Sequence, residues 1–376
     1  MRILIGVAVT VMFGCAPPWE EPSPGQTVQA SSGEDDDPSA WPRCPDRPDC
    51  TTGNGTGIYF EEGGRAAMDP VDLMIMRFIN TGSSVDVVAR YYQKGTGFWE
   101  YTRGRVEGVL TSTGLAPVRA MTASATIPTW LVAAPTPPGS FFELTDLDVV
   151  GLKLALSFPL ADNTRIYFAF WLNDRVIEWT HPSGSGIPAK MYKYSALYQQ
   201  VSSTWNPIAP IHVYCVDAHA QTDPLLFQEG IRVDPVFGSV TRPASPTKVV
   251  TLSCRKGAIA TVLSWGYRYL GSPADTFYFD AGIHMKRASY CADGHAYTET
   301  GANIAIEDNR GINMQMDSHI EAWWTPTGAL CLSTLRRPHI AADQGFSNRC
   351  PTRTPSALPA CPPTSAPVQW LRDWVP

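Results

Sequence analysis

The most informative part of the chain reads Ile283-His-Met-Lys-Arg-Ala-Ser-Tyr-Cys291, then Ala-Asp-Gly-His295, and after a polar loop Glu321-Ala-Trp-Trp-Thr-Pro-Thr-Gly-Ala-Leu-Cys331-Leu. It places two cysteines inside the densest run of Trp, Tyr, His and turn residues in the sequence. Aromatic residues dominate folded cores, and Gly and Pro mark the turns between short elements. The stretch from Ile283 to Pro338 therefore predicts a small core that is cross-linked and rich in turns.

The composition of the whole chain indicates a β-rich protein. Its 376 residues, of which 44% are hydrophobic and 12 are Trp, are enough for two domains with their own cores. The 33 Pro and 30 Gly indicate short elements joined by many turns. The net charge is −6, and no run of Lys and Arg is long enough to follow a phosphate backbone. We therefore expect no nucleic-acid partner.

The N-terminus has the pattern of an exported protein. Residues 1–13 are a short positive start and an apolar run that is too short to span a membrane, as in a signal peptide. The run ends at Gly14-Cys15, which resembles the lipobox of bacterial lipoproteins. We expect residues 1–14 to be removed and a lipid on Cys15 to anchor the chain in a membrane. Ala16, in place of Asp, resembles lipoproteins of the outer membrane or cell surface. An ordinary signal peptide is the alternative.

Residues 15–50 have the composition of a flexible tether. They consist mostly of Pro, Ser, Gly, Gln and acidic residues. They lack the periodic apolar residues whose burial would offset the entropy of ordering. Such a segment would hold the folded part of an anchored protein away from the bilayer.

The nine cysteines suggest disulfide bonds in an oxidising compartment. If Cys15 carries lipid, eight remain, which is an even number. Two local bonds are predicted from closeness in sequence, Cys44–Cys50 and Cys350–Cys361. Three pairings are open to Cys215, Cys254, Cys291 and Cys331, and closeness along the chain favours Cys215–Cys254 and Cys291–Cys331. A thiolate nucleophile at Cys291 with His295 as base would need a reduced cysteine, which export disfavours.

Residues 51–204 are predicted to form an antiparallel β domain, a sandwich or an open barrel. Apolar and polar residues alternate over 85–91 and 150–158, which gives each segment a core face and an outer face. Two apolar runs around Asn173-Asp174 predict a hairpin with a tight turn. The aromatic residues of this region are expected in its core.

Residues 205–345 are predicted to form a small, disulfide-linked α+β domain, so the overall fold class is β-rich α+β. Short strands are expected at 231–233, 238–240 and 249–254. Helical spacing of apolar residues is found over 257–267 and, less distinctly, over 283–291. Residues 346–376 are interpreted as a Pro-rich C-terminal extension.

Several segments over residues 212–337 resemble the ADYC domain family of bacterial secreted proteins and lipoproteins, which is named for an Arg-Ala-Asp-Tyr-Cys motif. The matching segments are Phe227-Gln-Glu-Gly-Ile231, Asp234-Pro235, Gly238, Cys254-Arg-Lys-Gly-Ala-Ile-Ala260, Trp265-Gly-Tyr267, Arg287-Ala-Ser-Tyr-Cys291, Asp293-Gly294 and Glu321-Ala322 to Cys331. Ser289 stands where the family has its Asp, which argues against catalysis by the motif. The resemblance implies no activity.

Members of this family often carry two further cysteines, one near Val262 and one near Gly282. Both are absent here. The joint loss of two cysteines is what a dispensable disulfide would produce, and it favours a structural role for the family's other cysteines.

The strongest enzymatic hypothesis combines His295, Asp293 and Glu321, with His319 nearby in sequence, as acid and base of an extracytoplasmic hydrolase. Their spacing matches no zinc motif, and no calcium loop, P-loop or dinucleotide fingerprint is found, so we expect neither metal nor cofactor. The preferred hypothesis is a non-enzymatic binding module whose partner is an unknown protein or glycan. A purely structural envelope protein is a further alternative.

Overall fold

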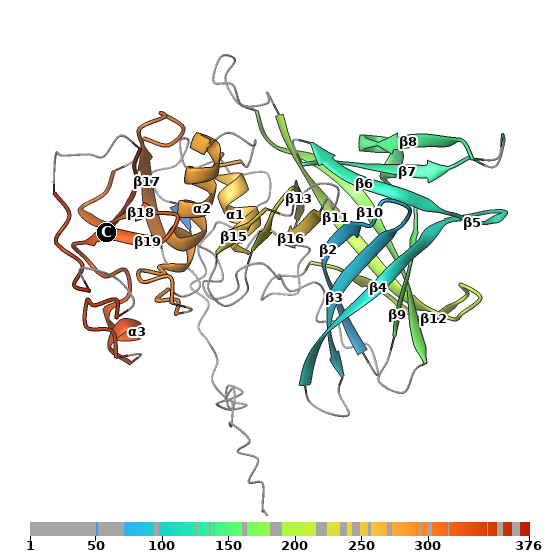
Figure 1. Ribbon diagram of the computed structural model, residues 1–376, viewed down its shortest axis with the longest axis horizontal. Coiled ribbons are helices and arrows are strands. Elements are labelled where there is room, and N and C mark those ends of the chain that lie inside the picture. The colour runs from blue at the N-terminus through green and yellow to red at the C-terminus, as the bar shows by residue number, and fades with distance from the viewer. Residues whose placement is uncertain are drawn as a thin grey trace, which may run out of the picture. The chain divides into compact units, whose positions relative to one another are not determined.

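The largest element of the fold is an antiparallel sheet of ten strands (Figure 1). Eight of these strands form a closed, barrel-like ring in which each pairs with two neighbours, because β10 also pairs with β11. In ring order they are β2 (Val71–Asn80), β3 (Val85–Gln93), β4 (Phe98–Thr111), β9 (Leu154–Pro159), β10 (Arg165–Thr180), β11 (Lys190–Val201), β13 (Leu225–Glu229) and β16 (Val249–Cys254). The two remaining strands, β5 (Gly114–Ala116) and β12 (Pro207–Val213), pair with β4 and β11.

The computed structural model describes only part of the chain. The described residues are 50–51, 71–93, 98–124, 126–134, 137, 139–159, 164–180, 190–215, 224–233, 239–242, 249–254, 257–268, 273–293, 295–298, 303–314, 316–343, 345–351, 356–362 and 369–376. The predicted signal peptide, the lipidation site Cys15, the tether and the Cys44–Cys50 bond lie outside the described residues. None of the helices in the described ranges has the length and apolarity of a transmembrane span.

Alternation of side chains builds the core inside the closed sheet. Leu154, Leu156 and Phe158 of β9 are fully or almost fully buried there with aromatic residues of β10, β11 and β13. Side chains in a strand point alternately to its two faces, so the apolar periodicity of the sequence places these residues on one face. The predicted β-rich α+β class with an antiparallel N-terminal sheet is confirmed.

The hairpin predicted at Asn173-Asp174 is wrong. These residues lie inside β10, which continues for 16 residues. The register between β10 and β11 shifts between Leu172 and Asp174, which is the signature of a β-bulge. The long partner strand β11 pairs with both halves of β10, so the extra residue is absorbed as a bulge instead of reversing the chain.

A three-stranded sheet packs against the closed sheet. It consists of β6 (Val118–Ser124), β7 (Ile127–Ala133) and β8 (Phe141–Thr145), followed by the 3-10 helix η3 (Asp146–Val149). The buried Asn80 side chain joins the two sheets, because it donates to the Met121 carbonyl (2.7 Å) and accepts from the Met121 N–H (2.8 Å). Trp130 of β7 is completely buried in the same core.

Strands β13 and β16 connect the closed sheet with the helical part of the chain. Leu225 and Phe227 face the core of the closed sheet, whereas Leu226 packs with α1 (Ala258–Ser264) and α2 (Pro273–Arg287). Both strands follow residue 205, so the sheet continues past the position where the sequence suggested a domain boundary. All described residues belong to one compact unit, Pro42–Pro376. The predicted strand pair around Asp234-Pro235 is present as β14 (Arg232–Val233) and β15 (Val240–Thr241).

The C-terminal residues form the centre of a second, five-stranded sheet. Its order is β1 (Cys50–Thr51), β17 (Asn303–Asp308), β20 (Leu371–Val375), β18 (His319–Thr325) and β19 (Gly328–Leu332). A short helix, α3 (Pro338–Asp343), follows β19. Because β20 pairs with both β17 and β18, residues 371–375 are an integral part of this core, which corrects the interpretation of residues 346–376 as an extension.

The disulfide bonds fasten the same C-terminal segment. Cys215 and Cys254 form the predicted bond. The predicted pairs Cys291–Cys331 and Cys350–Cys361 are wrong, because Cys291 pairs with Cys350 and Cys331 pairs with Cys361. Folding brings Cys350 against the motif and Cys361 against β19, so closeness in space overrides closeness in sequence.

Candidate functional site: the buried cluster around Tyr290 and Arg336

The motif Arg287-Ala-Ser-Tyr-Cys291 begins where helix α2 ends. Ala288 has a left-handed conformation (φ 49°), its N–H donates to Met285, and the Ser289 N–H donates to His284. These two bonds are those of a Schellman C-cap, which usually carries Gly at the left-handed position. The C-cap turns the chain so that Tyr290 and Cys291 leave the helix axis.

Arg336 lies outside α2 and donates hydrogen bonds to carbonyl groups at the C-terminal end of this helix. It follows β19, its side chain is only 1% exposed, and its guanidinium has an acceptor for every donor direction. The acceptors are Glu321 Oε2 (2.8 Å), Asp373 Oδ2 (2.7 Å), the carbonyls of Met285 (2.8 Å) and Lys286 (3.3 Å), and Thr298 Oγ1 (3.4 Å). Arg336 therefore caps the helix and pairs with two carboxylates.

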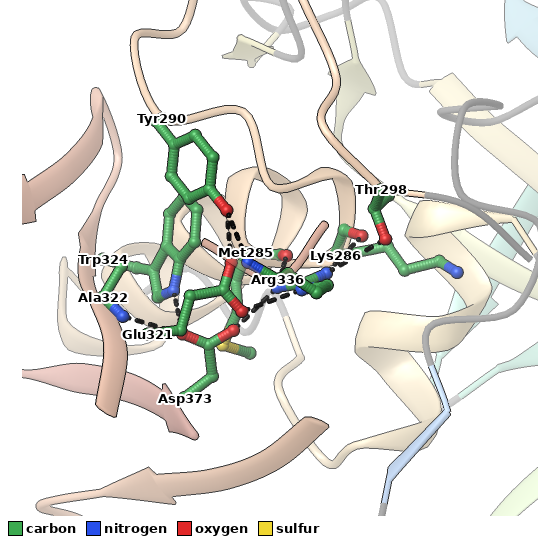
Figure 2. Close-up of polar contacts among 9 residues, drawn as sticks. All are labelled: Met285, Lys286, Tyr290, Thr298, Glu321, Ala322, Trp324, Arg336 and Asp373. Carbon is green, nitrogen blue, oxygen red and sulfur yellow. Dashed lines mark hydrogen bonds and ion pairs between the residues drawn. The ribbon is translucent and has the colours of Figure 1, made fainter. Parts of the chain in front are cut away.

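The two carboxylates are also bonded by other groups (Figure 2). Tyr290 donates its hydroxyl to Glu321 Oε1 (2.7 Å), and Trp324 donates its indole N–H to Asp373 Oδ1 (2.8 Å). Both carboxylate side chains are completely buried. The cluster joins α2, the motif, β18 and β20, and its polar groups are satisfied within the protein.

The charges of this cluster favour one bound proton. One guanidinium faces two carboxylates in a dry environment, and two buried like charges disfavour each other. Burial, and then the neighbouring Glu321, raises the pKa of Asp373 well above its usual range, while Arg336 opposes the shift. Burial and the Glu321 carboxylate also raise the pKa of the Tyr290 hydroxyl, which therefore stays a donor.

Tyr290 is the aromatic centre of the cluster. Its ring stacks on Trp324 (centroids 5.5 Å apart), Tyr297 (5.4 Å) and Phe346 (5.3 Å). Such contacts add to the burial of the rings themselves. The tyrosine of the motif is thus a packing and hydrogen-bonding residue.

Ser289 is the least satisfied part of the motif. It is completely buried, and its hydroxyl has no hydrogen-bond partner among the residues that the structure describes. A buried unpaired hydroxyl is costly. Ser289 stands where the motif Arg-Ala-Asp-Tyr-Cys has its Asp.

The proposed catalytic residues are only partly brought together. His295 Nδ1 lies 3.2 Å from Asp293 Oδ1, and the His295 side chain is 56% exposed. Glu321 is instead completely buried, with one oxygen bonded to Tyr290 and the other to Arg336. His319 is exposed at the start of β18. Asp293 and His295 therefore form a pair. The described hydrogen bonds of Glu321 include neither of these residues.

Sequence reasoning missed Arg336 and Asp373. The pattern Leu371-Arg-Asp-Trp-Val375 puts Asp373 on the apolar face of a strand, which is an available signal for a buried partner. Nothing in the pattern around Arg336 distinguishes it from a surface residue. Among the described residues, no group of three or more His, Cys, Asp or Glu is arranged to hold a metal ion.

A second cluster lies on the opposite side of β20, which is more exposed. Arg372 alternates with the buried Leu371 and Asp373, and its guanidinium lies over the rings of Trp370 (4.8 Å) and Trp374 (5.2 Å). Glu307 accepts from Arg372 Nε (2.6 Å) and Trp374 Nε1 (3.2 Å). We call Glu307, Trp370, Arg372 and Trp374 the Trp–Arg face.

One family matches the chain. The family described as ADYC domain matches residues 147–338, which is 192 of 376 residues. The match begins at 147 and not near 212, so it includes β9 to β12 as well as the motif region. It ends before β20 and so does not include Asp373. No curated protein and no solved structure gives a significant match.

Proposed function

We propose that this chain, which belongs to the ADYC domain family, is an exported, lipid-anchored bacterial envelope protein. In this proposal it acts as a non-enzymatic binding module. The family description names no activity, so the proposal rests on the residues of this chain.

One observation carries the binding role. The charged groups of the buried cluster are bonded within the protein, since both oxygens of Glu321 and every donor direction of Arg336 have buried partners. A catalytic acid or base must reach a substrate proton, directly or through one water. The cluster is therefore better suited to holding a surface in place than to performing chemistry.

The Trp–Arg face is the surface that we assign to the partner. Trp370, Arg372 and Trp374 are partly exposed; Arg372 and Trp374 lie in β20, and Trp370 directly precedes it. Trp and Arg are the residues most enriched at binding hot spots, because they combine large apolar area with directional donors. The buried cluster on the other side of β20 fixes the position of this strand.

Export is supported by the cysteines and by the N-terminal pattern. The six cysteines whose side chains are described form three disulfide bonds. Disulfides persist mainly in oxidising compartments. Lipidation of Cys15 would leave an even number of cysteines for pairing.

The binding role is tested with the mature, oxidised protein as bait in envelope extracts. We expect one or more partners to be retained by the wild-type chain and lost with Arg372→Ala plus Trp374→Ala. Arg103→Ala, an exposed change on β4, is the matched control and should retain them. Equal capture by all three proteins would contradict the assignment of the Trp–Arg face.

The anchor is tested separately by cell fractionation of Cys15→Ser. We expect this variant to move from the membrane to the soluble fraction, because one residue carries the lipid. Continued membrane association would contradict the anchor without affecting the binding proposal.

A further inference from the structure

Arg372, at the centre of the Trp–Arg face, uses only part of its hydrogen-bonding capacity. Its Nε donates to Glu307 Oε2 (2.6 Å). In the part of the chain that the structure describes, neither of its terminal nitrogens, Nη1 and Nη2, has a hydrogen-bond partner. The side chain is only 13% exposed, so these donors have limited access to water. Donors in such a position gain from a specific acceptor.

The surrounding rings fix the direction of this guanidinium. Its Cζ lies 4.8 Å from the ring centroid of Trp370, 5.2 Å from that of Trp374 and 5.7 Å from that of Trp323. Trp323 is 2% exposed and stacks on Trp370, with ring centroids 6.4 Å apart. Glu307 also accepts from the indole N–H of Trp374 (3.2 Å). The terminal nitrogens are therefore held in place in advance, which lowers the entropy cost of binding.

The buried cluster on the other side of β20 shows how an arginine of this protein takes a second carboxylate. Arg336 donates from Nε to Glu321 (2.8 Å) and from Nη2 to Asp373 (2.7 Å). Arg372 repeats the first of these bonds with Glu307. Among the described residues, no carboxylate repeats the second. A carboxylate of another molecule can therefore complete the same arrangement at Arg372.

The geometry of the donors also favours a carboxylate over other acceptors. The terminal nitrogens of a guanidinium point two parallel N–H groups in one direction, which matches the two oxygens of a carboxylate. A single carbonyl or hydroxyl oxygen lacks the second acceptor of this pair. The opposite charges strengthen both hydrogen bonds.

The sheet around Arg372 favours a sugar over a peptide as the carrier of this carboxylate. β20 pairs with β17 on one side and with β18 on the other, so its backbone has no free edge to which a peptide could add as a strand. The surface offers instead two partly exposed indole rings next to the guanidinium. A sugar ring can pack its apolar C–H face against an indole while its substituents reach the polar group.

We propose that the partner of the Trp–Arg face is a glycan that contains uronic acid. Its carboxylate accepts from Nη1 and Nη2 of Arg372, and its sugar ring packs against Trp370 or Trp374. This inference rests on the proposed binding role of the face and specifies the chemistry of the partner.

Isothermal titration calorimetry of the oxidised full chain tests this inference with three uronic acid polymers, oligogalacturonate, oligomannuronate and hyaluronan. We expect at least one of them to bind. Its methyl ester should bind at least about tenfold more weakly, because the ester removes the charge and weakens one acceptor. Oligoglutamate, which carries its carboxylates on a peptide, should also bind at least about tenfold more weakly than that glycan, because it has no sugar ring to pack against an indole. These comparisons use the wild-type protein, so they do not depend on the folding of a variant.

Arg372→Lys keeps the positive charge and loses the pair of parallel donors, so it should weaken glycan binding about tenfold. The matched control is Arg103→Lys on β4, where the arginine also pairs with a carboxylate, that of Asp86, and is 61% exposed. This control should bind the glycan as the wild type does. Circular dichroism checks that both variants are folded.

The inference is overturned if none of the three glycans binds the wild-type chain, or if the methyl ester or oligoglutamate binds as tightly as the acidic glycan. Equal affinities of Arg372→Lys and Arg103→Lys would overturn it as well. The binding role survives such a result if envelope extracts still yield a partner that is lost with Arg372→Ala plus Trp374→Ala. If this double variant retains every partner, the assignment of the Trp–Arg face itself is wrong.

Discussion

The closed sheet and the C-terminal sheet contain the same hairpin turn in different surroundings. Thr111-Ser-Thr-Gly114 joins β4 to β5, and Thr325-Pro-Thr-Gly328 joins β18 to β19. In each turn the first Thr hydroxyl donates to the Gly carbonyl, at 2.7 and 2.8 Å. The two glycines have φ values of +125° and +100°. Local sequence thus produces the same local structure in both places.

What differs is the environment of the turn. A Cβ atom on Gly114 would meet no atom within 4 Å, whereas on Gly328 it would lie 2.5 Å from the Tyr290 carbonyl oxygen. That carbonyl also accepts the Ala329 N–H (2.8 Å). The hairpin of the closed sheet is free at its tip, and the hairpin of the C-terminal sheet is pressed against the motif. The comparison teaches that long-range polar contacts hold the motif region in place. The closed sheet is instead stabilised by the apolar side chains that alternate into its core.

The largest effect is expected from removing the charge at the centre of the C-terminal core. Arg336→Ala leaves Glu321 and Asp373 buried without their cation, which should lower the free energy of unfolding by about 3–5 kcal/mol. Arg103→Ala breaks an ion pair with Asp86 whose arginine is 61% exposed, and should cost at most about 1 kcal/mol. Urea denaturation of the oxidised proteins measures both. Equal losses would remove the distinction between the two regions.

The two turns provide the next test. Gly114→Ala meets only the backbone strain of a positive φ, about 1–2 kcal/mol. Gly328→Ala meets that strain and a collision with the Tyr290 carbonyl, which should add about 1–3 kcal/mol of overpacking. The difference between the two unfolding free energies isolates the contact with the motif. The comparison fails if Gly114→Ala is the more damaging change.

The raised pKa of Asp373 gives a smaller, pH-dependent effect. The folded-state pKa of Asp373 is raised, so its contribution to stability is fully present below the ordinary Asp pKa of about 3.9 and is lost as pH rises through the folded-state value. Asp373→Asn cannot lose this proton. The stability of the wild type relative to this variant should therefore fall as pH rises above about 4. Urea midpoints measured from pH 4 to 8 test this, and a constant or rising difference would contradict it.

The smallest effect on stability is expected at the contact between α1 and α2. A Cβ atom on Gly282 would lie 2.9 Å from Val262 Cγ1, so these two positions are neighbours. Val262→Cys plus Gly282→Cys should form an additional disulfide, since the Cγ1 position of Val262, which a cysteine Sγ can occupy, lies 2.9 Å from a Cβ on residue 282. Thiol titration of the unfolded protein checks it, with each single variant as a control that keeps one free thiol. Two free thiols in the double variant would show that the helices are not in this contact.

The sequence allowed part of the fold to be predicted, for a physical reason. Hydrophobic periodicity is a local property of the sequence. It therefore predicted the strands that contain Val85 and Leu154 and the helix expected over residues 257–267. The turn predicted at Asn173 is not formed, because the length of the partner strand β11 determines whether the chain reverses there. Closure of the sheet likewise depends on pairings between strands far apart in sequence.

The candidate site was predictable only in its aromatic half. The density of Trp and Tyr around Cys291 indicated a core, and that core is present around Tyr290. Its charged half was not predictable, because Arg336 and Asp373 become partners only when β20 inserts between β17 and β18. The same insertion explains why closeness in sequence gave two wrong disulfide pairs.

The disulfide pairing tests most directly whether the C-terminal segment belongs to the core of the motif. Trypsin can separate the four cysteines concerned, because Arg310 lies between Cys291 and Cys331, and Arg353 lies between Cys350 and Cys361. Mass spectrometry of the digested protein without reduction should find peptides that join Cys291 to Cys350 and Cys331 to Cys361. Peptides that join Cys291 to Cys331 and Cys350 to Cys361 would contradict the account.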